Sequence, residues 1–462
     1  MTLQNKNAFF NILGPIILNG INFFTIPIYT RILGPDQYGI VSVFTTWVGI
    51  FSIIFGLQVQ GSIGTATARI DKAELKEYLS SVLGLGLLFS AVCLIGWIIF
   101  LPFISKAMLL VQPVVLGIAI QSIGFFVISF VTSSFTFAKK AEKSFAVSVT
   151  TALSTTALSM FLLFFYFSGD HLYFGRIFGQ VVPIAFIATF LAIYILKSGN
   201  FAFKKKYILF CLPICLPLIF HGLSHIILGQ SDRVMIQHMM DNSATGIYSF
   251  VVIFTNVLNV IWLALNNTWV PFYYDDLKKG NLDLILSKTK GYLFNYSIIA
   301  IVFSLWAPEV IKIFTPPSFW KAITLLPYFV MSVYFVFLYS FPVNFEFYHK
   351  KTFSIAIGTI GAALVNIGLN YFFIPIWGMA GAALATLIAH VFLFLFHDCI
   401  ARYALSEHYH YAFRIFMPYL IGTLCFVIVS HFLDDSLIIR WFIGILLSLV
   451  FFYHIRKRKN IF

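Results

Sequence analysis

Long stretches without a single Lys, Arg, Asp or Glu run through this chain. Five of them cover residues 7–30, 37–68, 207–231, 242–274 and 352–397. A bilayer core about 30 Å thick is crossed by about 20 apolar residues in a helix, so each stretch is long enough to span it at least once. Only 10% of the residues are charged, against about 25% in soluble domains. An all-α integral membrane protein is therefore predicted.

The apolar stretches divide into about 14 predicted transmembrane helices. Their approximate ranges are 10–30, 38–60, 79–102, 113–137, 145–167, 174–196, 207–229, 245–270, 291–312, 322–346, 353–374, 378–397, 413–432 and 438–454. We expect residues 1–200 and 201–400 to form two pseudo-symmetric six-helix bundles. Residues 401–462 are expected to add two helices and a basic cytoplasmic tail.

Positive charges are distributed unevenly between the two sides of this arrangement. With the N-terminus in the cytoplasm, 23 of the 30 Lys and Arg residues fall on the cytoplasmic side and 7 outside. Because Lys and Arg gather in cytoplasmic loops, both termini are predicted to be cytoplasmic. The net charge of +13 is then explained by loops beside anionic lipid and not by nucleic acid. A cleaved signal peptide is not expected, since no basic region precedes a short apolar core at the N-terminus.

A weak internal repeat relates residues 14–31 to residues 216–233. At the constant offset of 202, the identical pairs are Pro15 and Pro217, Ile17 and Ile219, Gly20 and Gly222, and Arg31 and Arg233. Six predicted helices separate the copies, so both have the same orientation in the membrane. Parallel repeats of this kind place a binding site between two halves. The alternative is chance similarity between apolar helices.

Polar residues inside the predicted helices are candidates for lining a cavity, because they are costly in hydrocarbon unless they face water or a partner. Asn19 and Asn22 lie on the first predicted helix, and His221, His225 and Asp232 follow one face of the seventh. We interpret the five as lining a central cavity. His221, His225 and Asp232 are also candidates for proton or cation coupling. Hydrogen bonding between helices is the alternative.

A second polar stripe lies on the eighth predicted helix. Asn259, Trp262 and Asn266 follow one another in steps of three and four, and Trp269 continues the series. Amides next to aromatic faces suit sugars, whose hydroxyls form hydrogen bonds and whose C–H faces stack on rings. Asn259, Trp262 and Asn266 are therefore candidate sugar contacts. The alternative places Trp269 at the membrane interface and the others in helix packing.

Arg31 and Arg233 are candidate contacts for a phosphate or pyrophosphate. Both occupy equivalent positions of the repeat, on the outer side. A guanidinium stays charged and binds phosphate oxygens through two parallel hydrogen bonds. The alternative is that both side chains extend to the outer interface.

Four further residues are expected to have structural roles. Glu309 and Lys312, three apart at a helix end, are interpreted as a pair at the membrane rim. Glu346 is expected to be solvated at the inner end of its helix, with proton or cation binding as the alternative. His390 and His397 are expected to pack or to form hydrogen bonds.

Catalytic motifs are absent from the sequence, which contains no Walker loop, GxSxG, HExxH or DxD. The five cysteines imply neither a disulfide framework nor a metal site. The acidic residues of the outer loops are expected to be scattered, at Asp36, Asp170, Asp232, Asp241, Asp434 and Asp435. We therefore expect that the protein is not an enzyme and that it binds neither a cofactor nor a metal. A membrane glycosyltransferase or polymerase, with Asp36 and the pair Asp434–Asp435 as its catalytic region, is the least favoured alternative.

Three segments resemble the signatures of bacterial polysaccharide flippases. The first runs from Pro27 to Gly39 as PIYTRILGPDQYG. The second is Asp232-Arg233 followed by GIYS at 246–249. The third joins NIGLN at 366–370, Ile374-Pro375 and GMAGAALAT at 378–386. Together they resemble flippases of the Wzx type, in the multidrug/oligosaccharidyl-lipid/polysaccharide exporter superfamily.

This resemblance implies a function as well as a fold. Such proteins translocate oligosaccharide repeat units linked to undecaprenyl pyrophosphate across the bacterial cytoplasmic membrane, for O-antigen, capsule or exopolysaccharide assembly, by alternating access. The implied partners are this lipid-linked oligosaccharide, membrane lipid, and polymerase and chain-length proteins of the same pathway. A multidrug or cation antiporter of the same superfamily is the main alternative.

Overall fold

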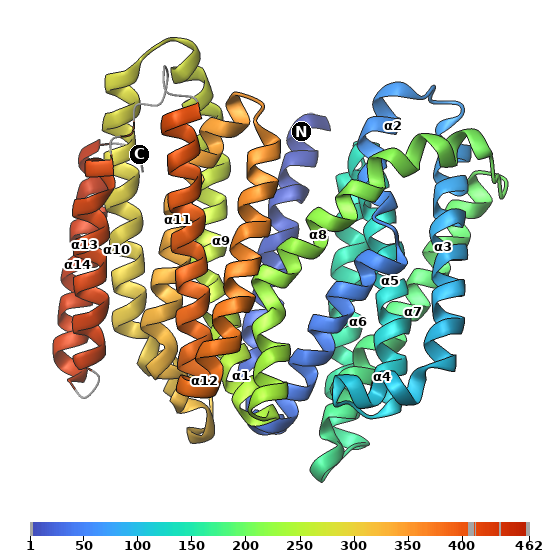
Figure 1. Cartoon of the computed structure of the whole chain (residues 1–462), viewed down its shortest axis with the longest axis horizontal. Helices are drawn as coiled ribbons and strands as arrows, with labels where there is room; N and C mark the ends of the chain where they lie inside the picture. The colour runs from blue at the N-terminus through green and yellow to red at the C-terminus, as the bar shows by residue number, and fades with distance from the viewer. Residues whose placement is uncertain (1–2, 405–410, 412, 434–435, 459–462) are drawn as a thin grey trace. The chain divides into compact units, whose positions relative to one another are not determined.

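The structure, a computed structural model, describes residues 3–404, 411, 413–433 and 436–458. Every regular element in these ranges is a helix (Figure 1). Twelve of the helices are long and apolar enough to cross a membrane. The prediction of an all-α, multi-pass membrane protein is confirmed.

Two of the long helices each contain two predicted spans. Helix α1 (Leu3–Phe55) changes direction at Gly34, where φ is 65°, and α12 (Thr352–Ala404) does so at Gly378, where φ is 57°. Glycine adopts these left-handed conformations without the steric cost that a Cβ brings. Both glycines lie in the segments that resemble flippase signatures. Because each break divides one helix into two predicted spans, 12 helices correspond to 14 predicted spans.

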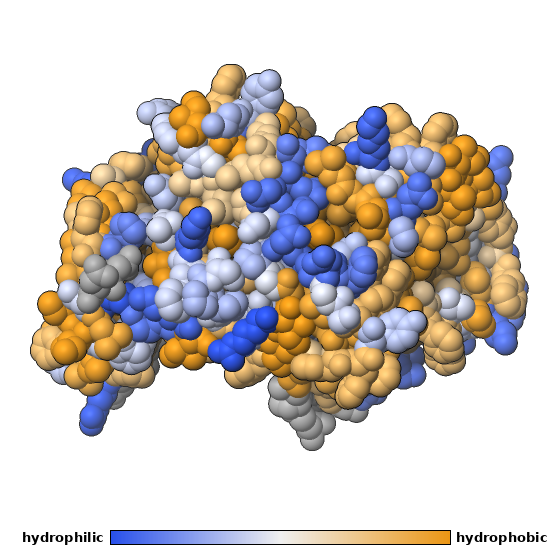
Figure 2. Space-filling view, turned by 90° about the horizontal axis from the view of Figure 1, so that it is seen from below, coloured by the Kyte–Doolittle hydropathy of each residue, from blue (hydrophilic) through white to orange (hydrophobic). Residues whose placement is uncertain are grey.

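Many large apolar side chains are exposed, as expected for a protein whose solvent is lipid. Phe186 and Phe190 on α7 (Leu172–Ser198) are 80% and 70% exposed. Figure 2 shows hydrophobic residues over much of one face, with patches of hydrophilic residues between them.

The chain divides into two compact units, Met1–Gly246 and Ile247–Phe462. The first unit contains α1, η1 (Val59–Ser62), α2 (Ile63–Arg69), α3 (Leu75–Ile99), α4 (Leu101–Met108), α5 (Gln112–Phe137), α6 (Ala141–Phe165), η2 (Gly169–His171), α7 and α8 (Lys205–Met239). Helix α5 is central, because it packs against α1, α3, α6 and α7. Phe126 and Phe130 of α5 are buried in the core of this unit.

The second unit contains most of α9 (Asn242–Lys278), then α10 (Leu282–Phe314), η3 (Pro317–Leu325), α11 (Leu326–Tyr348), α12, α13 (Phe413–Phe432) and α14 (Leu437–Arg458). Its core is rich in aromatic residues. The ring centroids of Tyr296 on α10 and Phe337 on α11 are 4.2 Å apart. Both α13 and α14 pack against α10. The bundle boundaries expected near residues 200 and 400 remain a prediction.

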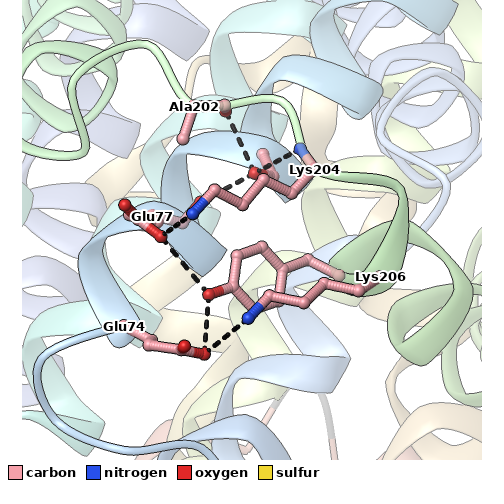
Figure 3. A network of polar contacts seen from close by, with 7 residues as sticks. Glu74, Glu77, Ala202, Lys204 and Lys206 are labelled. Atoms are coloured by element: carbon pink, nitrogen blue, oxygen red, sulfur yellow. Dashed lines mark hydrogen bonds and ion pairs between the residues drawn. The ribbon is translucent and has the colours of Figure 1, made fainter.

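The connection between α7 and α8 is held to α3 by a polar network (Figure 3). Lys204 pairs with Glu77 at 2.5 Å, and Lys206 pairs with Glu74 at 2.8 Å. The Tyr207 hydroxyl also donates to Glu74, at 2.9 Å. The backbone joins the network through Ser81, whose hydroxyl donates to the Ala202 carbonyl oxygen and accepts from the Lys204 N–H. The start of α8 is therefore fixed to the first unit.

Candidate functional site

The two predicted pyrophosphate contacts lie in different environments. Helix α8 continues to Met239, ten residues past the predicted end, so Asp232 and Arg233 lie inside it. Their side chains are only 4% and 8% exposed. Arg31, on α1, is exposed. Extension to the outer interface is thus wrong for Arg233, and the binding of pyrophosphate by both arginines remains a prediction.

A third arginine, Arg176 on α7, was not among the candidates from the sequence. Its Nη1 donates to the Tyr29 hydroxyl at 2.8 Å and to Ser159 Oγ at 3.1 Å. The guanidinium carbon also lies 4.0 Å from the centre of the Tyr29 ring. Tyr38 is within electrostatic reach of both Arg233 and Arg176. Helices α1, α6, α7 and α8 therefore bring two guanidinium groups close to two tyrosines inside the first unit.

The described cavity candidates on α8, His221, His225 and Asp232, do not lie in one environment. His221 and His225 are exposed on α8, whereas Asp232 is buried on the same helix. Seven residues separate His225 from Asp232, which is about 10 Å along a helix. The side chains of Asn19 and Asn22 lie outside those that the structure describes. The cavity and coupling roles of all five residues remain predictions.

Two turns of the first unit, around Gly39 and Gly246, meet in close backbone contact. A Cβ on Gly39 would lie 1.9 Å from the Asn242 carbonyl oxygen, and one on Gly246 would lie 1.9 Å from that of Pro35. Gln37 donates to the Gly169 carbonyl oxygen at 2.9 Å and accepts from the Tyr173 N–H at 2.8 Å. Two segments of the flippase signatures therefore touch each other.

Three of the aspartates expected to be scattered lie near one another in this region. Asp36 forms a side-chain hydrogen bond with Asn242 and is within electrostatic reach of Asp241 and Asp170. The three come from different predicted loops, as the sequence indicates, and these segments, far apart in sequence, meet in the first unit. Even so, no group of three His, Cys, Asp or Glu residues in the described ranges is placed to hold a metal ion. Asp434 and Asp435 lie outside the described residues.

The predicted sugar contacts on α9 are half-buried. Asn266 accepts a hydrogen bond from Asn344 Nδ2 at 2.9 Å, and Asn259 donates to Asn256 at 3.3 Å. The buried Trp262 indole N–H has no hydrogen-bond partner among the described residues. Trp269 faces the protein interior, because it is 1% exposed and belongs to the core of the second unit. Sugar binding remains a prediction.

A buried amide cluster joins the two halves of α12 to α9. Asn370 Nδ2 donates to Asn366 Oδ1 at 3.1 Å, and Asn366 Nδ2 donates to Thr386 Oγ1 at 3.3 Å. The Tyr248 hydroxyl lies 3.3 Å from the same Thr386 oxygen. All four residues come from the segments that resemble flippase signatures.

Two acidic residues assigned to helix rims are buried. Glu309 forms an ion pair with Arg440 on α14 and not with Lys312. Glu346 is 0% exposed, and its Oε1 lies 2.7 Å from Nδ1 of His397. The solvated-rim interpretation was wrong for both, because helices remote in sequence cover them. His390 and His397 form hydrogen bonds as expected, His390 with Ser332 at 3.3 Å.

These features define a multi-pass membrane protein with buried polar clusters between its helices. Residues 5–274, more than half of the chain, match the family model described as "Polysaccharide biosynthesis protein". The chain belongs to this family, which confirms the resemblance at the level of the family.

Two similar proteins come from Haemophilus influenzae. An "Uncharacterized membrane protein" is 24% identical over 388 residues, which is 79% of this chain and 88% of that protein. "Lsg locus putative protein 1" is 25% identical over 361 residues, 75% of this chain and 85% of that protein.

Solved structures show the same fold at low sequence identity. "Lipid II flippase MurJ, inward closed conformation" matches with a TM-score of 0.76 and 16% identity, over 98% of this chain and 100% of that one. An inward-facing "multidrug resistance MATE family transporter of the MOP superfamily" matches with a TM-score of 0.61 and 16% identity, over 85% and 96%. The fold is therefore that of known flippases and multidrug transporters.

Proposed function

We propose that this protein is a flippase and not an enzyme. Its substrate would be an oligosaccharide repeat unit on undecaprenyl pyrophosphate, moved from the cytoplasmic to the outer leaflet for O-antigen, capsule or exopolysaccharide assembly. One observation carries the proposal: a chain of the polysaccharide biosynthesis family has the fold of a lipid II flippase along 98% of its length.

The polar groups inside the helices suit such a head group. Arg233 and Arg176, close to Tyr38, supply positive charge for the pyrophosphate, together with Arg31 on α1. Asn259, Trp262 and Asn266 supply hydrogen bonds and a ring for the sugars. The prenyl chain would stay in lipid while the head group passes through a polar interior by alternating access.

Bending of α8 fits this cycle. Pro213 and Pro217 lie inside α8, where each removes a backbone hydrogen bond and favours a kink. The proposed location is the bacterial cytoplasmic membrane with both termini inside. Polymerase and chain-length proteins of the same pathway would be the partners.

Translocation can be measured directly. The full chain would be reconstituted in vesicles containing fluorescent undecaprenyl-pyrophosphate oligosaccharide, and an impermeant quencher would report the outer leaflet. Without flipping, the quencher reaches only the labelled lipid in the outer leaflet. With flipping, we expect it to quench nearly all of the labelled lipid. No increase, in vesicles where a lipid II flippase moves its own substrate, would refute the proposal. If Arg31→Ala and Arg233→Ala both leave the rate unchanged, the pyrophosphate assignment fails.

A multidrug or cation antiporter is the second candidate, because the fold also matches a multidrug transporter over 85% of this chain. This function predicts that expression raises growth in cationic drugs and that vesicles accumulate a cationic dye. The flippase proposal predicts neither effect.

A further inference from the structure

The carboxylate of Glu346 and the imidazole of His397 form a fully buried pair within the second unit. Glu346 lies near the end of α11, and His397 lies on the second half of α12. Nδ1 of His397 is 2.7 Å from Oε1 of Glu346, and both side chains are 0% exposed. Ionisable groups in a membrane-spanning segment are costly and commonly mark proton or ion pathways.

Few groups contact the pair directly. The Ser354 hydroxyl donates to the other carboxylate oxygen of Glu346. Nε2 of His397 has no hydrogen-bond partner among the described residues. It faces Gly358, where a Cβ would lie 2.6 Å away. The second nitrogen of the imidazole therefore lies against a glycine in a space that a larger side chain would fill.

Other titratable groups lie on the same helices as the pair and on the segments beside them. Asp398, next to His397 on α12, pairs with Arg402 at 2.6 and 2.9 Å. The Tyr339 ring on α11 lies 6.0 Å from the His397 ring. From α9, the Tyr274 hydroxyl donates to the Asn344 carbonyl oxygen. In the α11–α12 connection, Lys351 donates its backbone N–H to the Glu346 carbonyl oxygen, and the Lys350 and Lys351 side chains are exposed.

The number of protons on the pair decides its net charge. With one proton, the pair is neutral overall, whether the proton sits on Glu346 or on His397. Removal of this proton leaves a carboxylate that is buried without a cation, which is strongly unfavourable until water reaches it. Proton release is thus linked to any movement of α11 against α12 that hydrates the pair.

We propose that the Glu346–His397 pair is a proton-binding site that couples transport to proton movement. In one conformation the buried pair holds one proton; in the other, hydration lets the proton leave to water. The pair lies next to residues 349–351, whose lysines are predicted to be cytoplasmic. The proton would therefore be taken up from the outer side in one conformation and released on the cytoplasmic side in the other. This inference deepens the proposed function and rests on it for the identity of the substrate.

The coupling test uses vesicles containing the full chain, lipid-linked oligosaccharide and an imposed pH gradient. One pH unit corresponds to a tenfold ratio, so one coupled proton shifts the steady-state leaflet distribution by up to about tenfold. Glu346→Gln keeps the size and hydrogen-bonding capacity of the side chain, but an amide cannot take up and release a proton as a carboxylate does. We expect this variant to flip substrate without responding to the gradient. The matched control, His390→Gln, changes a hydrogen-bonded imidazole two turns earlier on α12 and should keep the full response.

A second readout does not depend on the substrate. Infrared difference spectra of the wild-type protein, recorded across a pH series, should contain a carboxyl or imidazole band from proton exchange at the pair. Glu346→Gln and His397→Gln should each remove or shift this band. An unchanged gradient response in folded Glu346→Gln, or a wild-type spectrum without the band, would overturn the proposal. If the wild-type protein flips no lipid-linked oligosaccharide, the proposed function fails, whereas the infrared titration still decides whether the pair binds a proton.

Discussion

Arg440 on α14 donates through Nη2 to Oε1 of Glu309 on α10, and both side chains are buried inside the second unit. The pair fixes the last helix of the chain to α10. Removal of one partner leaves a buried charge without compensation, which costs about 3–5 kcal/mol. We therefore expect Arg440→Ala to lower the free energy of unfolding by about that amount, measured by thermal or denaturant unfolding in detergent.

Two variants separate this effect from a general loss of charge. Lys312→Ala changes an exposed cation near Glu309 on α10, whose contact is the Trp320 ring at 6.0 Å, and should cost less than about 1 kcal/mol. The double variant Glu309→Gln/Arg440→Met should be more stable than Arg440→Ala, because no isolated charge remains. Arg440→Ala with wild-type stability would show that the pair does not hold α14.

Local patterns in the sequence predicted the helices well. Apolar stretches of the length of a membrane span predicted every long helix that the structure describes. Of the two breaks, Gly34 lies in the predicted connection between two spans, and Gly378 lies at the start of a predicted span. Each helix signal is contained within its own 20 to 30 residues. Among the described α-helices, α2 and α4 were missed, because their seven and eight residues are too few to span a bilayer.

Buried pairs were not predictable in this way, because their partners lie on different helices. Spacing assigned Glu309 to Lys312, three residues away, but its partner is 131 residues away. Glu346 and His397 are 51 residues apart. Helix periodicity identifies the face on which a side chain lies but not the helix that packs against it. The sequence therefore predicted the helices on which single polar residues lie, but not the residues that they contact.

Gly39 and Gly246 should be intolerant of any side chain. A Cβ at either position would lie 1.9 Å from a backbone carbonyl oxygen of the opposite turn, and backbone cannot move aside as a flexible side chain does. Overpacking of this kind typically costs about 1–3 kcal/mol. Gly39→Ala and Gly246→Ala are therefore expected to lower the unfolding temperature in detergent.

Gly229→Ala is the control for these two variants. Gly229 lies on α8 with nothing within 4 Å of its added Cβ. Alanine favours a helix by up to about 1 kcal/mol over glycine, so this variant should be as stable as wild type or more so. Equal stability of all three alanine variants would contradict the close contact of the two turns.

Acid should weaken the attachment of the α7–α8 connection. Hydrogen bonds from Lys206 and then from Tyr207 lower the pKa of Glu74. A carboxyl with a lowered pKa in the folded protein stabilises it fully above the unfolded value of about 4.3, and this stabilisation is lost as the pH falls through the folded value. Glu74→Gln should therefore unfold at a lower temperature than wild type at pH 7, and the difference should shrink as the pH falls below about 4.3 and close below the lowered pKa of the folded protein.

Stabilisation by Lys204, at the basic end of the same network, depends on pH in the opposite direction. A hydrogen bond to Glu77 raises the pKa of Lys204, so its contribution is complete below the unfolded value of about 10.4 and is lost as the pH rises through the folded value. Lys204→Gln should thus be less stable than wild type at pH 7, and the difference should close as the pH rises above about 10.4, opposite to the acid dependence of Glu74→Gln. A Glu74→Gln difference that stays constant from pH 7 to acid would show that the carboxylate charge does not contribute.

Arg176 should be sensitive to the shape of its side chain and not only to its charge. Its guanidinium donates from one nitrogen to both Tyr29 and Ser159 and lies against the Tyr29 ring. A lysine keeps the charge but loses the planar fork and the stacking. Hydrogen bonds to charged groups contribute about 1.5–3 kcal/mol, so Arg176→Lys is expected to destabilise the protein by up to that amount in unfolding measurements. Tyr29→Phe removes only the hydroxyl partner and keeps the ring, and it should cost less. If Arg176→Lys is as stable as wild type but translocates lipid-linked oligosaccharide more slowly in vesicles, Arg176 contacts the substrate and is not required for the fold.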